Sequence, residues 1–485
     1  MPVWECYSQT GLSFNMKGFI LIFILFPWAI YAQKHDNLQL FGFGNNAPNP
    51  LLFGGIVVDY SFSPPKLYPQ KRKVDFSFYS GIGSDSSGHL MFYTNGISIR
   101  DTTHNVMLNG DTLNPGPLWL QWKDKYYPNG PFCFSLPSPG KQNQYTFFHL
   151  AVEYGTGLSS PFYYTVVDMN GNNGLGKVTL KNKILLPNGV SCTSPVAVKH
   201  GNGRDWWVII GELSSPYLYT FLLDPTGVNG PFKTEMPYWY SAQEYQSVNA
   251  ISPDGNTYVR SDGEHGLYIF DFDRCSGAFS NLRLLPFNEP DFFSFATVFA
   301  PDSRHLYMSS WSFVTQLDIS TPDIAASLDT VAYFDGKASP YEPFLTGFFN
   351  PNLGPDGKIY YATTNSTIVW HVIHQPNLPG VAADIEQHGI DLTKWNDGTM
   401  AIYPNYRLGE WEGAPCDTLN GQKPGDGFSK TSWFPPAESK IGQYKLLPGI
   451  GQAREKDDTP RKRHPTMAEM AIERAAQAPI LNSKN

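Results

Sequence analysis

His371 and His374 are the residues whose type and spacing first suggest chemistry, because pairs of imidazoles bind transition metals. They lie three positions apart in the segment VWHVIHQP, which has the composition of a β-strand. Side chains three positions apart on a strand point to opposite faces of the sheet, so these two cannot ligate one ion. The chain also has no Cys-x-x-Cys pair of the kind that holds structural zinc. We therefore predict no metal site.

A second candidate is the segment DMNGNNGLG at 168–176, which resembles a calcium-binding loop. Asn173 stands where that loop requires glycine, and no glutamate closes the loop, so a turn after a strand explains the segment better. The sequence contains no Gly-x-Ser-x-Gly, His-Glu-x-x-His or phosphate-binding-loop pattern. We predict no catalytic residues and no cofactor.

Aspartates recur at the ends of apolar segments and could be interpreted as a ring of carboxylates. The segments are YTVVDMN, YTFLLDP, LYIFDFD and VTQLDIS. The apolar run within each segment ends at an aspartate: Asp168, Asp224, Asp271 and Asp318. Aspartate at a strand end commonly accepts hydrogen bonds from the backbone just beyond it. We predict such local Asx-turns, one in each unit, in place of a shared acidic site.

A second series of short segments combines a tight turn with a strand. SPDGNTYVRS begins at 252, APDSRHLYMS at 300 and GPDGKIYYAT at 354. Proline presets the first corner of a turn, aspartate bonds the backbone, and glycine tolerates positive φ. Weaker copies begin at 84, 138 and 199. Each copy predicts a hairpin turn followed by the second strand of that hairpin.

The two series keep in step at intervals of about 50 residues over six units, which is typical of an all-β β-propeller of WD40-like repeats. A large β-sandwich is the alternative, but it would not repeat both the strand-end aspartates and the Pro-Asp turns at the same interval. We predict seven blades, because ring closure hides the sheet edges and an unmarked blade can be completed by the two chain ends. NLQLFGFG at 37–44 and GTMAIYPNYRLG at 398–409 are expected in the same blade or in adjacent blades.

The N-terminal segment has the pattern of a secretory leader. Lys17 precedes an apolar stretch at 18–30, and Ala32 offers a cleavage point before Gln33. The stretch is short for a membrane anchor, and we expect translation to start at Met16. We therefore assign residues 1–32 to the leader, 33–420 to the propeller, and 421–485 to a Gly/Pro-rich and then charged tail, disordered with one short helix.

Five cysteines bear on the redox environment of the chain. Loss of the leader removes Cys6 and leaves Cys133, Cys192, Cys275 and Cys416, which allow three complete pairings. Cys133 and Cys192 occupy comparable places in successive units and could lie near each other. All four could equally remain free buried thiols, so the sequence leaves the pairing open.

The charge balance excludes one class of partner. The net charge is −8, and the run RKRH at 461–464 is the only basic cluster. Nucleic-acid binding needs a basic surface that displaces counterions from phosphate. We predict no nucleic-acid partner, and no stable transmembrane segment after leader removal.

Several stretches together resemble the secreted WD40-like β-propeller proteins of gliding bacteria that usually carry a C-terminal type IX secretion sorting domain. Among them are FGNNAPNPLLF at 43, GHLMFYTNGISIRDTTHNVMLNGD at 88, VAVKHGNGRDWWVI at 196 and YPNYRLGEWEGAPCDTLN at 403. The resemblance covers roughly residues 38–420 and implies an extracellular binding or surface module without catalytic residues. A sorting domain is not evident after residue 420.

The expected function is a secreted or cell-surface, non-catalytic module that binds protein or glycan through propeller loops. It would be periplasmic if no route across an outer membrane exists. The stretches 45–72, 109–131, 153–162 and 228–246 are interpreted as long, irregular loops that could carry the site rather than the repeated turns. Their exposed aromatics would supply contact area: Tyr126, Tyr127, Tyr154, Tyr238, Trp239 and Tyr240. Two alternatives remain: these rings pack the loops onto the blades, or the protein is an extracellular hydrolase or lyase with a site at the central channel.

Overall fold

The chain divides into a unit over Met1–Ala32, which lies outside the described residues, and a unit that begins at Gln33. The structure is a computed structural model. It describes residues 33–45, 52–124, 127, 131–152, 159–187, 194–237, 248–262, 265–286, 296–340, 344–363, 366–413, 416, 438–441 and 445–447.

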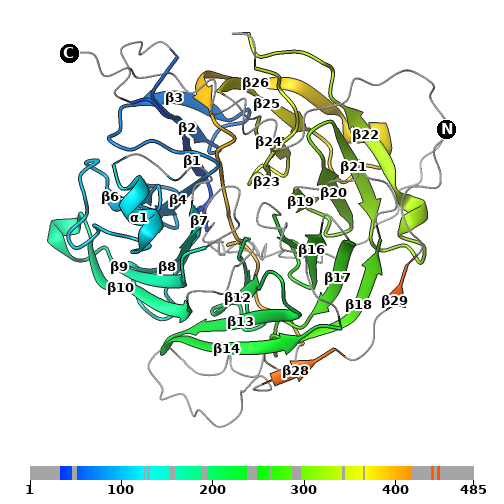
Figure 1. Ribbon diagram of the computed structural model, residues 1–485, viewed down its shortest axis with the longest axis horizontal. Helices are drawn as coiled ribbons and strands as arrows, with labels where there is room; N and C mark the ends of the chain where they lie inside the picture. The colour runs from blue at the N-terminus through cyan, green and yellow to red at the C-terminus, as the bar shows by residue number, and fades with distance from the viewer. Residues whose placement is uncertain are drawn as a thin grey trace, which may run out of the picture. The chain divides into compact units, whose positions relative to one another are not determined.

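Seven sheets, formed by the described residues, stand around one axis, as predicted for a β-propeller (Figure 1). We number the blades in chain order. Blade 1 has three strands, β1 (Leu38–Phe41), β2 (Gly55–Asp59) and β3 (Lys66–Gln70). Blade 2 contains β4 (Tyr79–Ser84), β5 (Leu90–Thr94) and β6 (Ile99–Asp101). Helix α1 (Pro117–Trp122) follows blade 2.

Blades 3 to 7 each have four strands that run outward from the axis in chain order, and blades 4 and 5 each gain a fifth strand from the C-terminal segment (Figure 1). Blade 3 has β7 (Pro131–Pro137), β8 (Gln144–Ala151), β9 (Phe162–Asp168) and β10 (Lys177–Leu186); blade 4 has β11 (Val196–Lys199), β12 (Trp206–Gly211), β13 (Tyr217–Asp224) and β14 (Gly227–Glu235). Blade 5 has β15 (Ala250–Ile251), β16 (Thr257–Asp262), β17 (Gly266–Phe272) and β18 (Phe279–Leu285). Blade 6 has β19 (Ala296–Phe299), β20 (His305–Ser309), β21 (Phe313–Asp318) and β22 (Asp329–Tyr333); blade 7 has β23 (Pro351–Leu353), β24 (Ile359–Tyr361), β25 (Thr367–Ile373) and β26 (Ile385–Asn396).

The middle strands are largely buried because blades pack face to face and cover both sides of each sheet. Every residue of β12 and of β25 is buried. The core consists of clusters between neighbouring blades; one joins Trp207 and Ile209 of blade 4 to Tyr268 and Phe270 of blade 5.

The Pro-Asp turns connect the first and second strands of their blades, as the sequence predicted. Backbone N–H groups two residues on donate to Asp254 and Asp302 at 3.0 and 2.9 Å. Gly357 has φ of 80°, the positive value that glycine tolerates. Local backbone geometry therefore accounts for the repeated segment.

The strand-end aspartates form the predicted Asx-turns in three of the four units. Asp168, Asp224 and Asp318 each accept a backbone N–H two residues later, at 2.7–3.0 Å. The prediction is wrong for Asp271, whose carboxylate binds the side chains of Asn281 and Arg283. In that unit Asp273 forms the turn, with the Cys275 N–H at 2.7 Å, because β17 continues one residue past Asp271.

The ring closes where the two predicted chain-end segments meet. Strand β27 (Met400–Ala401) pairs in parallel with β4 and also contacts β1. The Gln39 amide lies 2.7 Å from the Met400 sulfur, and Tyr403 donates a hydrogen bond to the Leu38 carbonyl. The two segments thus lie in adjacent sheets, as expected.

The stretch 45–72, interpreted as irregular, instead contains β2 and β3, and 228–235 belongs to β14. These two strands of the unmarked blade were not recognised because no Pro-Asp-Gly turn precedes β2. Its one visible signal is Asp59, which ends β2 and accepts the Ser61 N–H at 2.8 Å.

The segment 421–485, assigned to a tail, contributes two short strands to the propeller. Strand β28 (Glu438–Lys440) adds to the outer edge of blade 4 and β29 (Lys445–Leu446) to that of blade 5, both in parallel (Figure 1). The helix predicted at 467–478 lies outside the described residues.

Candidate functional site

Of the six aromatic candidates, only Tyr127 is among the described residues. It is buried against Ile97, Ala151 and α1, so its ring packs the segment onto the propeller, as in the alternative interpretation. Tyr126, Tyr154, Tyr238, Trp239 and Tyr240 lie outside the described residues, and their role stays a prediction.

The two histidines considered as metal ligands have separate partners. His371 is buried in β25, with Nε2 2.6 Å from the Thr346 carbonyl and Nδ1 accepting the His388 N–H at 3.0 Å. Burial lowers the pKa of His371 to about 4. His374 lies past the strand end and contacts Glu386 at 2.8 Å. Within the described ranges, no group of three His, Cys, Asp or Glu side chains is placed to hold a metal ion.

A cavity among the described residues lies at the inner ends of the blades and has a volume of about 370 Å³. The first strands of blades 4 to 7 form one side, and β27 with the chain that follows it forms the other. Half-buried apolar side chains face it from several elements: Val248, Ile251, Leu353 and Ile402.

The repeated turns contribute to the wall of this cavity. Pro253, Pro301 and Pro355 lie at its wall, one from each of blades 5, 6 and 7, and Pro404 faces them from the other side. Their pyrrolidine rings add to the apolar lining of the cavity. The sequence assigned these residues only to local turn geometry, so the turns have a second role that their spacing did not reveal.

Amide side chains at the inner ends of the blades connect neighbouring blades. Asn249 donates to the Ser194 carbonyl at 2.9 Å, and Asn350 donates to the Gly398 carbonyl at 3.0 Å. Tyr79 donates to the Asn350 side-chain oxygen at 3.2 Å, and burial raises its pKa. These polar groups line the cavity but are engaged in holding the ring together.

Asp36 is the carboxylate among the described lining residues. Arg407 binds both of its oxygens, with 2.7 Å between Nη2 and Oδ1, and also donates to Asn37 at 3.1 Å. Its charge is therefore neutralised by a bidentate partner. Asn352 also lines the cavity; its Nδ2 is buried without a hydrogen-bond partner.

The wall opposite blades 4 to 7 belongs to a strap, which we define as residues 402–413 and Cys416. Tyr406 donates to the Ser135 carbonyl of blade 3 at 2.6 Å, and Asn405 donates to the Pro253 carbonyl of blade 5 at 2.8 Å. The strap thus connects blades 3 and 5 on the inner side of the ring (Figure 1).

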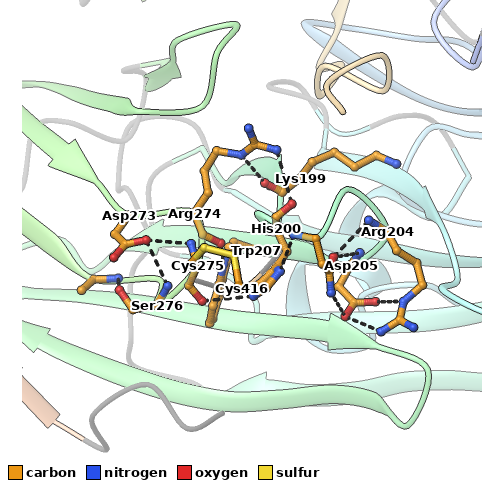
Figure 2. The surroundings of a disulfide bond; sticks show 12 residues. Lys199, His200, Arg204, Asp205, Trp207, Asp273, Arg274, Cys275, Ser276 and Cys416 are labelled. Carbon is orange, nitrogen blue, oxygen red and sulfur yellow. Dashed lines mark hydrogen bonds and ion pairs between the residues drawn. A yellow bond between two sulfur atoms is a disulfide. The ribbon is translucent and has the colours of Figure 1, made fainter. Parts of the chain in front are cut away.

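A disulfide joins Cys416 at the end of the strap to Cys275 of blade 5, with 5.6 Å between the Cα atoms (Figure 2). Cys133 is a free buried thiol, and burial raises its pKa. Cys133 is therefore not paired with Cys192, which lies outside the described residues. Sequence spacing could not identify the observed pair, because 141 residues separate the two cysteines.

The side chains around the disulfide hold two blades together. The indole of Trp207 donates to the Arg274 carbonyl at 2.8 Å, and the guanidinium of Arg274 donates to the Lys199 carbonyl at 2.9 Å. His200 accepts the Asn202 N–H at Nδ1 (3.0 Å), so Nε2 donates to the Cys275 carbonyl at 3.1 Å. Burial lowers the pKa of Lys199 to about 8, partly opposed by Asp205. These groups act in packing, away from the cavity wall.

Comparison with known proteins yields no family assignment. No protein-family profile and no curated protein matches the chain. Similar solved structures include a Lactobacillus plantarum protein (12% identity, 75% of this chain, 98% of that chain, TM-score 0.46). Others are a Bacteroides fragilis protein provisionally named a 6-phosphogluconolactonase (12%, 74% and 95%, TM-score 0.43) and the periplasmic gluconolactonase PpgL of Pseudomonas aeruginosa (10%, 72% and 81%, TM-score 0.33). Likeness at this level carries no information about what this chain binds or converts.

Across the described ranges, no helix is both long enough and apolar enough to span a bilayer.

Proposed function

We propose that this protein is an exported, non-catalytic binding module that takes an apolar side chain of a protein partner into the cavity at the inner ends of its blades. The observation that carries the proposal is the wall of the cavity. Aliphatic side chains and five prolines contribute much of its lining. The amides of Asn249 and Asn350 are engaged within the ring, and the ionisable pair, Asp36 and Arg407, is satisfied internally. Cavities of a few hundred Å³ with mostly apolar walls are typical of ligand sites.

The same wall favours binding over turnover. General acid–base catalysis needs a titratable side chain within reach of the reacting group. The carboxylate of Asp36 is held by Arg407, and the buried His149 and His371 have hydrogen-bond partners within the blades. An apolar wall also suits an aliphatic or aromatic side chain better than a sugar, whose hydroxyl groups require many polar partners.

The disulfide supports the proposed export. Disulfides form and persist in oxidising compartments and are rare in the reducing cytoplasm. The leader pattern at 16–32 agrees with this, so a location outside the cytoplasm, secreted or at the cell surface, belongs to the proposal.

The test is capture on peptide and glycan arrays by the purified protein and two leucine variants. Leu353→Trp fills the cavity, whereas Leu378→Trp places the same ring on an exposed site outside the cavity wall. We expect wild type and Leu378→Trp to capture peptides with an apolar residue and Leu353→Trp to lose capture at least tenfold. Equal capture by all three proteins would exclude this cavity.

A turnover assay with ester, lactone and glycan substrates addresses the enzyme alternative. Product formation that scales with protein concentration and is abolished in Leu353→Trp would replace the binding proposal. Capture of glycans alone, in the same variant pattern, would contradict the assignment to a protein partner.

A further inference from the structure

The strap supplies a large part of the cavity wall, although it belongs to none of the four blades opposite. Ile402, Tyr403, Pro404, Asn405 and Arg407 all line the cavity. The shape of the site therefore depends on where the strap lies.

The two halves of the strap are held in different ways. The inner half is anchored by side chains, including Tyr406 on Ser135 and Arg407 on Asp36. In the outer half, residues 409–413 are all exposed, and the buried residue that follows is Cys416. Because exposed chain buries little apolar surface, it contributes little to its own placement.

Among the connections that hold this outer half to blades 4 and 5, three involve Gly409, Trp411 and Cys416. The Trp411 N–H donates to the Gly201 carbonyl at 2.7 Å, and Arg274 donates to the Gly409 carbonyl at 2.5 Å. The third is the Cys275–Cys416 disulfide, whose two residues are both buried (Figure 2). The disulfide is the covalent connection among them.

We propose that the Cys275–Cys416 disulfide positions the strap and thereby completes the binding site, so that the site matures only after oxidation. Each thiol loses a proton, one S–S bond forms, and the two electrons reduce the disulfide of an exchange partner to two thiols. The reduced chain keeps the blades and the side-chain anchors of the inner half of the strap, but the end of the strap is no longer tied covalently, so the wall is held less tightly. This inference rests on the proposed function and adds its regulation: binding is acquired in the oxidising compartment.

The test compares wild type with the variant Cys275→Ser/Cys416→Ser, using N-phenyl-1-naphthylamine as the probe. This neutral apolar fluorophore brightens when it enters an apolar cavity. We expect the double variant to bind the probe at least tenfold more weakly at a temperature well below both unfolding midpoints. Hydrogen exchange in 402–413 should rise at least tenfold, while exchange in β12 and β16 stays within twofold of wild type.

If the double variant does not accumulate as folded protein, the folded wild type kept in excess reductant provides the same comparison. Wild-type probe affinity and unchanged strap exchange without the disulfide overturn the inference. Failure of the proposed function has a different signature, because Leu353→Trp would then bind the probe as well as Leu378→Trp does.

Discussion

Gly201 lies where a side chain has no room, because both sulfur atoms of the disulfide approach its Cα. A Cβ there would lie 2.4 Å from the Cys416 sulfur and 2.7 Å from the Cys275 sulfur. We expect Gly201→Ala to lower the free energy of unfolding by about 1–3 kcal/mol through overpacking. Chemical denaturation measures this, and Gly409→Ala is the matched control because nothing lies within 4 Å of its Cβ position. Equal stability of the two variants would show that the sulfur pair can move aside.

His149 makes the stability of blade 3 depend on pH. Its ring nitrogens contact Asn114 and Thr165 at 2.8 and 2.9 Å, and burial lowers its pKa to about 3. Below an unfolded-state pKa of about 6.5 the unfolded chain takes up a proton that the folded chain refuses. This stabilising contribution is therefore present above about pH 6.5 and is lost between there and about pH 3, by about 1.4 kcal/mol per pH unit.

The measurement is the free energy of unfolding of wild type and His149→Gln at pH 7 and pH 4.5. The slope with pH should be smaller in the variant, which lacks this titration but retains that of His371. Identical slopes would mean that the His149 ring is protonated in the folded state.

At the scale of elements, the short C-terminal strands attach by single apolar residues that follow them. Ile441 joins the cluster between blades 4 and 5, and Leu447 joins that between blades 5 and 6. Their N–H groups donate to the Glu235 and Leu284 carbonyls. The two strands thus bring apolar side chains into the clusters between successive blades. This gives a structural role to a segment whose composition indicated only a tail.

Adjacent leucines test this attachment. Leu447 is 4% exposed and Leu446 is 60% exposed. We expect Leu447→Ala to cost about 2–3 kcal/mol of stability by leaving a cavity, and Leu446→Ala to change it by less than about 0.5 kcal/mol. Thermal and urea unfolding of both variants measures these changes in the free energy of unfolding. A neutral effect of Leu447→Ala would mean that these strands are dispensable for the propeller.

At the scale of the whole molecule, Asp36 and Arg407 connect the two ends of the ring. Their side chains are 9% and 36% exposed, so the pair is only partly screened by solvent. A double-mutant cycle with Asp36→Asn and Arg407→Met should give a coupling energy of about 1 kcal/mol that weakens as salt is raised. Coupling indistinguishable from zero at low salt would leave closure to β27 and the apolar clusters alone.

The sequence by itself determined the features that depend on local backbone geometry. Proline, aspartate and glycine impose their φ values and hydrogen bonds within a few residues, so the turns at Asp254, Asp302 and Asp356 could be recognised from spacing alone. Their regular recurrence then indicated a ring. The same reasoning predicted a seventh, unmarked blade but did not recognise its strands β2 and β3, because Asp59 has no Pro-Asp-Gly turn to accompany it.

Only the tertiary structure decided what those turns surround. Pro253, Pro301 and Pro355 are about 50 residues apart in the chain and come together because the blades are arranged around a common axis. The strap, the Cys275–Cys416 pair and the buried residue Leu447 likewise depend on contacts between distant segments. Such contacts follow from ring closure and from burial shared between blades, and no local sequence pattern specifies them. The turns could therefore be predicted from the sequence, whereas the candidate site could be identified only in the tertiary structure.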